Sequence, residues 1–223
     1  MHNFPSALAA GYRHFREGDF QLAAGRYQQL ATEGQKPSTM VIACCDSRSA
    51  PELIFSRGPG DLFVIRNIAN MVPPYEPDTN LHGTSAAIEY GIKALKVSDV
   101  VVLGHAGCGG IQAALYPDAE LIQNSAFIGN WMQLLASTTS RLPTDLPDAF
   151  RASQLERLAV GQSLLNLRTF PFVHGLERAG NLRLHGTWFD VGTGELWVKD
   201  PHSDAFDRLS SDGDVVPGRG KGL

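Results

Sequence analysis

The sequence predicts an α/β protein with a central, mostly parallel β-sheet flanked by helices, an N-terminal helical arm and an antiparallel edge strand. Short apolar runs alternate with segments of helical periodicity, which is typical of parallel βαβ units. Two segments with helical spacing precede the first run, and the last two runs flank a Gly-Thr-Gly turn. The 223 residues are 43% apolar and 19% charged, so one domain with a substantial core is expected over residues 1–223.

The arm, residues 1–34, is expected to contain two helices between residues 5 and 33, interrupted near Gly18-Asp19. Apolar residues recur at helical spacing on both sides of the break, namely Leu8, Tyr12 and Phe15, then Leu22, Tyr27 and Leu30. Two interpretations stay open: a helical layer on its own domain, or an arm on a second subunit. Residues 35–200 are assigned to the α/β core, and residues 201–223, rich in Ser, Asp and Gly, to a flexible tail.

The first half of the core contains two strands and two helices. An apolar run predicts a strand over 40–43, and a short helix over 51–55 begins with proline, which suits a first helical turn. The run 62–65 is the second strand. Three prolines make 71–81 a loop, after which apolar residues at helical intervals predict a helix over 84–95.

The second half of the core continues this alternation and ends in two strands. Strands are expected at 100–103, 182–189 and 195–198, and helices at 108–115, 124–137 and 148–170. A polar segment with prolines connects the last two helices. The final two strands are joined around Gly192-Thr193-Gly194, which predicts an antiparallel edge.

Composition argues against several classes of partner and location. A net charge of −4 without a long basic stripe argues against nucleic acid, and no apolar window is long enough to cross a bilayer. Residues 1–10 lack the basic and apolar regions of a signal peptide. Three cysteines, two of them adjacent, do not resemble a secreted disulfide framework, so a reducing cytoplasm is expected.

Two cysteine-bearing segments each follow a predicted strand. Cys44 lies in Cys-Cys-Asp-Ser-Arg, and His105 and Cys108 lie in Gly-His-Ala-Gly-Cys-Gly-Gly. Side chains at the ends of neighbouring strands can meet in one crevice, although about sixty positions separate them here. Two thiolates and one imidazole suit Zn²⁺, and three protein ligands leave a fourth position for water or substrate, as in catalytic zinc sites.

Asp46 and Arg48 supply charged groups beside the first cysteine. Side chains two positions apart on an extended segment share a face, so an ion pair would keep the Asp46 carboxylate ionised and aimed. Zinc lowers the pKa of bound water from about 15.7 towards neutrality. An ionised Asp46 can then accept the hydrogen bond of the hydroxide. Asp46 could also bind zinc itself, which would close the site.

The other cysteine and the glycines have simpler interpretations. Cys45 is expected to be a small buried apolar filler, and a closed structural site would take Asp46 as its fourth ligand. The glycines around Cys108 lack the Lys-Ser/Thr of a phosphate-binding loop. They let the backbone pass close to the metal, and Gly109 starts a helix whose N–H groups favour anions. The other histidines have no metal-like spacing.

The motifs resemble those of a β-class carbonic anhydrase. The family pattern Cys-x-Asp-x-Arg followed by His-x-x-Cys is matched by Cys44, Asp46, Arg48, His105 and Cys108. Residues 60–74, 83–90 and 165–173 are similar to the corresponding runs of plant-type and many bacterial members. The resemblance extends over roughly residues 5–200.

The resemblance implies a zinc lyase that reversibly hydrates CO₂ to bicarbonate and a proton, by attack of zinc-bound hydroxide that the Asp46–Arg48 pair orients. It also implies a substrate pocket containing Gln35, Phe63, Tyr90 and Gly109. Gln35 would hydrogen-bond a bicarbonate oxygen, and Phe63 and Tyr90 would form an apolar wall for CO₂. In this family the pocket forms at a dimer interface, so a dimer or a tetramer is implied.

The resemblance also distinguishes two subtypes. Members gated by bicarbonate carry Trp three positions before the first zinc cysteine, where this chain has Val41. We therefore predict the open-site subgroup, with water as fourth ligand near neutral pH. Ser49 departs from the family pattern, in which Val commonly follows the Arg, and is expected to adjust packing without abolishing catalysis.

Three other functions are compatible with parts of these motifs. A relative could hydrolyse CS₂ or COS, with a similar metal site and different substrate access. A zinc-binding sensor or scaffold would need neither Asp46 nor Arg48, so the presence of both argues against it. A redox or nucleophilic thiol lacks a Cys-x-x-Cys motif, and Cys44 to Arg48 is too short for a Cys-x₅-Arg phosphatase loop.

Overall fold

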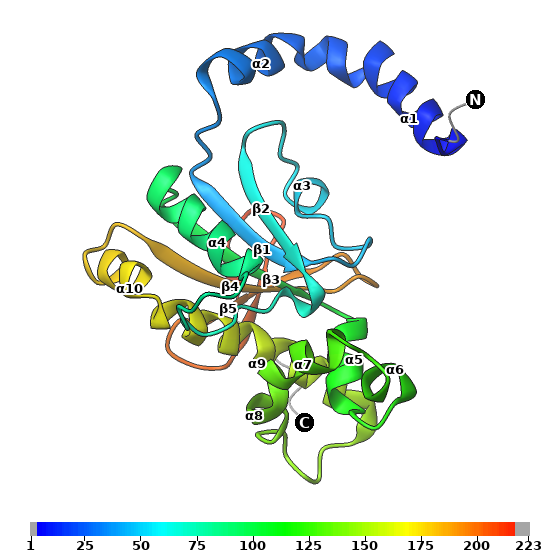
Figure 1. The fold of residues 1–223 in the computed structure, drawn as a ribbon, viewed down its shortest axis with the longest axis vertical. Coiled ribbons are helices and arrows are strands. Elements are labelled where there is room, and N and C mark those ends of the chain that lie inside the picture. Colours follow the sequence, from blue (N-terminus) through cyan, green and yellow to red (C-terminus); the bar gives the residue numbers. More distant parts are fainter. Residues whose placement is uncertain (1–3, 217–223) are drawn as a thin grey trace.

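The central sheet determines where the site lies. The computed structural model describes residues 4–216, and within them seven strands form one sheet in the order β2-β1-β3-β4-β5-β6-β7 (Figure 1). The parallel strands are β1 (Thr39–Cys44), β2 (Leu62–Asn67), β3 (Asp99–His105) and β4 (Arg183–Phe189). The antiparallel strands are β5 (Leu196–Lys199), β6 (Phe206–Leu209) and β7 (Val215–Val216). The predicted fold class, including the antiparallel edge, is confirmed.

Helices lie between and around these strands. The α-helices of the core are α3 (Pro51–Ile54), α4 (Gly83–Glu89), α5 (Gly109–Leu115), α6 (Glu120–Gln123), α7 (Ile128–Met132), α8 (Ala136–Thr139), α9 (Asp148–Thr169) and α10 (Pro171–Arg178). Two 3₁₀ turns, Ile68–Asn70 and Gln133–Leu135, and a π-helical turn, Tyr90–Ala94, complete the set. Between residues 4 and 216, no helix is both long enough and apolar enough to cross a membrane.

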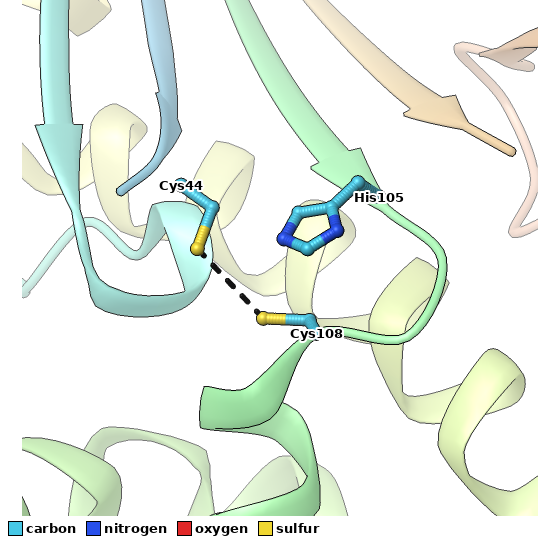
Figure 2. Close-up of side chains that lie close together, drawn as sticks. All are labelled: Cys44, His105 and Cys108. Carbon is cyan, nitrogen blue, oxygen red and sulfur yellow. Dashed lines mark hydrogen bonds between the residues drawn. The ribbon is translucent and has the colours of Figure 1, made fainter. Parts of the chain in front are cut away.

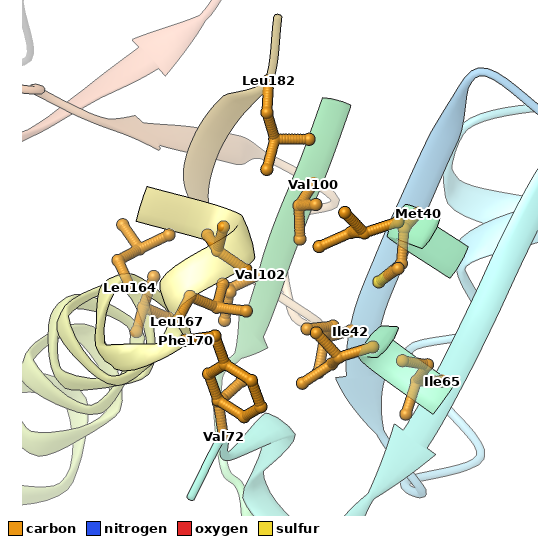
Figure 3. Packing of buried hydrophobic residues seen from close by; sticks show 14 of the residues in the cluster. Met40, Ile42, Ile65, Val72, Val100, Val102, Leu164, Leu167, Phe170 and Leu182 are labelled. Carbon is orange, nitrogen blue, oxygen red and sulfur yellow. The ribbon is translucent and has the colours of Figure 1, made fainter. Parts of the chain in front are cut away.

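The two faces of the sheet pack differently. Alternate side chains of β1 point to opposite faces, so Met40 and Ile42 face one way and Val41 and Ala43 the other. Met40 and Ile42 join the main core, which β3 shares with α4, α9 and α10 (Figure 3). Helix α9 approaches β3 closely at Gly104, where a Cβ atom would lie 2.7 Å from Val160 Cγ2. A larger residue at this position would push α9 away from the sheet.

The strand order creates a crevice at the carboxyl ends of β1 and β3. The chain runs from β1 to β2 on one side and then crosses to β3 on the other side of β1. Such a reversal of strand order leaves the loops after the two strands facing one crevice. Helices α5 to α8 pack at this end of the sheet (Figure 1), where a second core cluster includes Cys44 and Cys108.

The arm extends away from the sheet (Figure 1). Helices α1 (Ser6–Glu17) and α2 (Asp19–Glu33) break at Gly18 as predicted, but neither contains a buried residue. Arg26 on α2 donates a 3.2 Å hydrogen bond to the Pro59 carbonyl, while Leu22 is 90% exposed. The interpretation of the arm as a layer packed on its own domain is therefore wrong.

Two helical predictions need correction. The helix expected over 124–137 begins at Ile128 and is interrupted by the 3₁₀ turn before α8. Ser125 accounts for the late start, because its Oγ accepts a 2.7 Å hydrogen bond from the Gly129 N–H and favours a local turn. Helices α6 and α10 were not predicted. Helix α10 starts at Pro171 directly after α9 ends, so the periodicity of α9 obscures it.

The expected flexible tail, residues 201–223, also needs correction. Strand β6 pairs with β5, and strand β7 pairs with β6. Phe206 on β6 is 9% exposed and belongs to the main core cluster, which fixes this segment on the sheet. The prediction therefore fails for the β6–β7 segment, while residues 217–223 lie outside the described part of the chain.

Candidate metal centre

Three predicted ligands meet at the crevice. One ligand atom from each of Cys44, His105 and Cys108 lies within 4.8 Å of the other two. Figure 2 shows the three side chains pointing toward one another. The sulfur atoms of Cys44 and Cys108 are 3.9 Å apart. Cys44 ends β1 and His105 ends the neighbouring β3, so strand pairing alone brings these two together. All three side chains are at most 4% exposed.

The donor set fits a metal ion. His105 Nδ1 lies 3.0 Å from the Ala106 carbonyl oxygen, which can only accept, so Nδ1 carries the proton and Nε2 offers a lone pair. His105 Nε2 is buried and has no hydrogen-bond partner among the described residues. A buried nitrogen without a partner costs free energy unless another group binds it. Two thiols and this lone pair match the ligand chemistry of Zn²⁺.

The two sulfur atoms titrate as a pair. The hydrogen bond between the two thiols lowers the pKa of Cys44 below its ordinary value, with a smaller contribution from His105 in the same direction. Burial opposes both by raising it. The same hydrogen bond and burial raise the pKa of Cys108. The pair therefore loses one proton readily and holds the second. A bound divalent cation would favour loss of both, because thiolates are the ligand form.

Asp46 and Arg48 form the expected ion pair. Arg48 Nε donates to Asp46 Oδ1 at 2.9 Å and Nη2 donates to Oδ2 at 2.8 Å, a bidentate arrangement. The Arg48 hydrogen bonds hold the pKa of the Asp46 carboxyl well below its usual range. Arg48 Nη2 also donates to the Gly107 carbonyl at 3.0 Å, which connects the pair to the turn before Cys108.

Two residues that the motif analysis did not assign hold the Cys44–Asp46 backbone. Arg66 on β2 donates to the Cys44 carbonyl at 2.9 Å and to the Asp46 carbonyl at 2.6 Å. Ser49 is fully buried, and its Oγ donates to the same Asp46 carbonyl at 3.2 Å. The departure from Val at position 49 thus adds a hydrogen bond beneath the candidate site.

Glu156 on α9 is a third residue that the sequence did not reveal. Its side chain is buried, and its Oε1 atom accepts a 3.2 Å hydrogen bond from the Cys108 N–H. Burial raises the pKa of this carboxyl, against the effect of the hydrogen bonds that it accepts. A glutamate in a helical segment is usually solvated, so the sequence carried no signal of this contact.

Three of the four predicted substrate residues lie away from the metal ligands of the same chain. Phe63 pairs with Met40, whereas Cys44 pairs with Asn67 four positions later on β2. At about 3.3 Å per residue, Phe63 is about 13 Å along the sheet from the cysteine. The Phe63 and Tyr90 rings are 5.9 Å apart, and Gln35 is exposed before β1. Only Gly109, at the start of α5, adjoins the metal ligands.

Cys45 differs from its prediction. Its side chain is exposed, not a buried filler. It borders an open hollow of about 810 Å³, which Ile68 and Trp131 also line. Extended backbone sends consecutive side chains to opposite sides, so the inward direction of Cys44 turns Cys45 outward.

Similarity to known proteins covers most of the chain. A family model described as carbonic anhydrase matches residues 39–196. Beta carbonic anhydrase 3 of Arabidopsis thaliana is 36% identical over 199 residues, which span 86% of this chain and 76% of that protein. The solved β-carbonic anhydrase CcaA is 33% identical, with a TM-score of 0.82, over 90% of this chain and 97% of that one. A tetrameric β-carbonic anhydrase of Sordaria macrospora is 28% identical, with a TM-score of 0.75, over 88% and 97% of the two chains.

Proposed function

The chain belongs to the β-carbonic anhydrases, a family of lyases, and on that premise we propose that it hydrates CO₂ reversibly at a zinc ion held by Cys44, His105 and Cys108. The observation that supports this metal set most strongly is the convergence of three buried ligand atoms. His105 Nε2, which lacks a partner among the described residues, is the clearest of them. A scaffold built only for packing would leave that nitrogen paired.

The Asp46–Arg48 pair is proposed to orient the attacking oxygen. Bound zinc would supply a Lewis-acid position that makes water nucleophilic near neutral pH. Asp46 accepts the hydrogen bond of the attacking group, and an ionised carboxylate can only accept, so an oxygen lone pair is left facing the carbon of CO₂. Arg48 keeps the carboxylate ionised and fixed by its two hydrogen bonds.

The same ion pair supports an open site. Both carboxylate oxygens of Asp46 are engaged by Arg48, which opposes their use as a fourth metal ligand. Val41, at the position of the Trp in bicarbonate-gated members, is buried against the α3 side of the sheet. The fourth position is therefore proposed to stay available to solvent near neutral pH. A zinc-bound structure at pH 7.5 with Asp46 on the metal would contradict this.

The substrate pocket is proposed to need a second copy of the chain. The cysteines lie at the carboxyl end of β1. Phe63 lies near the other end of the sheet in contact with Tyr90, and Gln35 precedes β1, so one chain does not assemble these three residues around its own metal. The tetrameric relative from Sordaria macrospora supports self-association. The free cysteines are also compatible with the reducing cytoplasm, which we propose as the compartment.

Stopped-flow measurement of CO₂ hydration by the zinc-loaded protein tests the proposal. We expect saturable hydration that Cys44→Ser abolishes, and much slower hydrolysis of CS₂ under the same conditions. Hydration no faster than the buffer would refute the activity. Preferential hydrolysis of CS₂ would instead favour the alternative substrate class.

A further inference from the structure

A buried carboxylate on α9 contacts the turn that carries a metal ligand. Glu156 is 3% exposed, and both of its oxygens are used. Oε1 accepts a 3.2 Å hydrogen bond from the Cys108 N–H, and Oε2 accepts a 3.0 Å hydrogen bond from Trp188 Nε1. Within residues 4–216 Glu156 forms no salt bridge, and these two hydrogen bonds are its direct polar contacts. Burying a carboxylate costs free energy of folding, so a role that offsets this cost is expected.

Packing fixes the Glu156 side chain in this place. Trp188 on β4 pairs with Gly104 on β3, and Gly104 directly precedes the ligand His105. Arg157, the residue after Glu156, places its guanidinium 3.8 Å from the centre of the Trp188 ring. Helix α9 also packs closely over Gly104. Glu156 therefore bridges α9, β4 and the loop after β3.

The turn itself is held from two sides. Gly107 has a φ angle of +67°, a left-handed backbone conformation that favours glycine. The Gly107 carbonyl accepts a 3.0 Å hydrogen bond from Arg48, while the next N–H, of Cys108, donates to Glu156. Glu156 and the Asp46–Arg48 pair thus hold the two sides of the single peptide group that joins Gly107 to Cys108.

We propose that Glu156 is a positioning residue of the metal centre, which holds the Gly107–Cys108 turn so that the Cys108 sulfur faces Cys44 and His105. This inference rests on the metal site of the proposed function. Both partners of Glu156 are donors, so the position needs two acceptors. A carboxylate supplies two, whereas glutamine of the same shape supplies one acceptor and turns an N–H toward the second donor.

The test measures zinc affinity in four variants by competition with a chelator. In the single variant Glu156→Gln, the amide N–H faces one of the two donors, the Cys108 N–H or Trp188 Nε1. We expect this variant to bind zinc about 10- to 100-fold more weakly, as for other groups that orient metal ligands. Trp188→Phe removes one donor and keeps the bond to Cys108, so its affinity loss should be much smaller. In the Trp188→Phe background, Glu156→Gln retains an acceptor for Cys108, whereas the similarly shaped Glu156→Met does not.

The decisive comparison is between those two double variants. We expect the Gln double variant to bind zinc close to Trp188→Phe, and the Met double variant to bind about 10- to 100-fold more weakly. Their metal-free forms should unfold at similar temperatures, because the two side chains have similar shape. Equal zinc affinity in the two would overturn the inference, as would wild-type affinity in Glu156→Gln. Failure of the wild-type protein to bind zinc would be a different result, which would overturn the proposed metal centre together with this inference.

Discussion

At the scale of single residues, two adjacent cysteines have opposite environments. Cys44 is 4% exposed, and its sulfur lies 3.9 Å from that of Cys108. Cys45 is exposed beside the hollow that Trp131 lines. The direction in which β1 ends decides which thiol joins the metal centre. The pair therefore offers a matched control for any test of the site, because the same substitution can be made one position apart.

Asp46→Asn should separate metal binding from turnover. Asparagine keeps the size of the side chain but loses the charge that pairs with Arg48 and one of the two acceptor oxygens. We expect a full complement of zinc and a fall in kcat/KM of about 100-fold or more, as for other hydrogen-bonding groups aimed at the reacting atoms. Zinc analysis and stopped-flow CO₂ hydration provide the two measurements. Wild-type turnover in this variant would remove Asp46 from the mechanism.

The sequence predicted the metal ligands because their positions follow from local pattern. Cys44 and His105 come at or just after apolar runs that predict strands, the structure pairs these two strands, and Cys108 lies three positions after His105. The supporting contacts of Glu156 had no such signal. The bond from Cys108 to Glu156 joins residues 48 positions apart, and it depends on how α9 is rotated about its axis on the sheet. Periodicity does not determine that rotation to within one side chain.

At the scale of elements, a charged cluster ties the amino ends of β3 and β4 together. Asp99 accepts two hydrogen bonds of 2.7 Å from Arg183 and one of 2.9 Å from His185. The Arg183 hydrogen bonds make the largest contribution to keeping the pKa of Asp99 well below its usual range. This cluster lies at the opposite end of the sheet from the metal ligands. It stabilises the register of two parallel strands without taking part in the chemistry.

Arg183→Gln should reduce stability in a manner that depends on pH. A carboxyl whose pKa is lower in the folded than in the unfolded chain contributes stability above its unfolded pKa. That stability is lost as pH falls from the ordinary value of 3.8 through the folded value. The free energy of unfolding should therefore differ most between wild type and variant near pH 7, and the difference should shrink towards pH 2. Urea unfolding of the metal-free proteins measures it.

Arg141→Gln serves as the control for this measurement. Arg141 pairs with Asp204, whose side chain is 60% exposed, so solvent screens the interaction. We expect a smaller difference at pH 7 than for Arg183→Gln. Equal, pH-independent effects of the two substitutions would show that Asp99 does not stabilise the β3–β4 pair.

Several core elements that periodicity predicted have a buried stripe of their own. Strands β1 and β3 and helix α9 carry such stripes, and their positions agree with the structure. Strand β6 has four residues, of which Phe206 alone is buried, so pairing with β5 and not its own pattern makes it a strand. Short elements of this kind depend on tertiary neighbours that a local pattern does not contain.

At the scale of the whole molecule, one chain exposes apolar or aromatic side chains on two surfaces. The arm exposes apolar side chains, including Leu8 at 60% and Tyr12 at 62%. Phe63 and Tyr90 pack against each other away from the metal ligands, and Tyr90 is 52% exposed. Both observations fit an assembly in which a second copy covers the arm and completes the pocket. The sequence pattern named these aromatic residues through resemblance, but only the fold showed that they lie apart from the metal of their own chain.

Mixed dimers can test whether the pocket is shared between copies. One copy would carry Cys44→Ser, and the other both Phe63→Ala and Tyr90→Ala. If aromatic residues of one copy serve the metal of the other, the mixed dimer contains one intact site and should recover about half of the wild-type turnover. Differently tagged copies, expressed together and purified through both tags, allow CO₂ hydration to be measured on the mixed species alone. No recovery above the two parent variants would place the aromatic residues outside the neighbouring site.

The zinc content of two neighbouring serine variants tests the central claim most directly. Wild type and Cys45→Ser should each contain one zinc per chain and hydrate CO₂, because Cys45 points away from the centre. Cys44→Ser should lose both the zinc and the activity. Zinc retained at full content in Cys44→Ser, or lost equally from Cys45→Ser, would contradict the assignment of Cys44, His105 and Cys108 as the metal-binding centre.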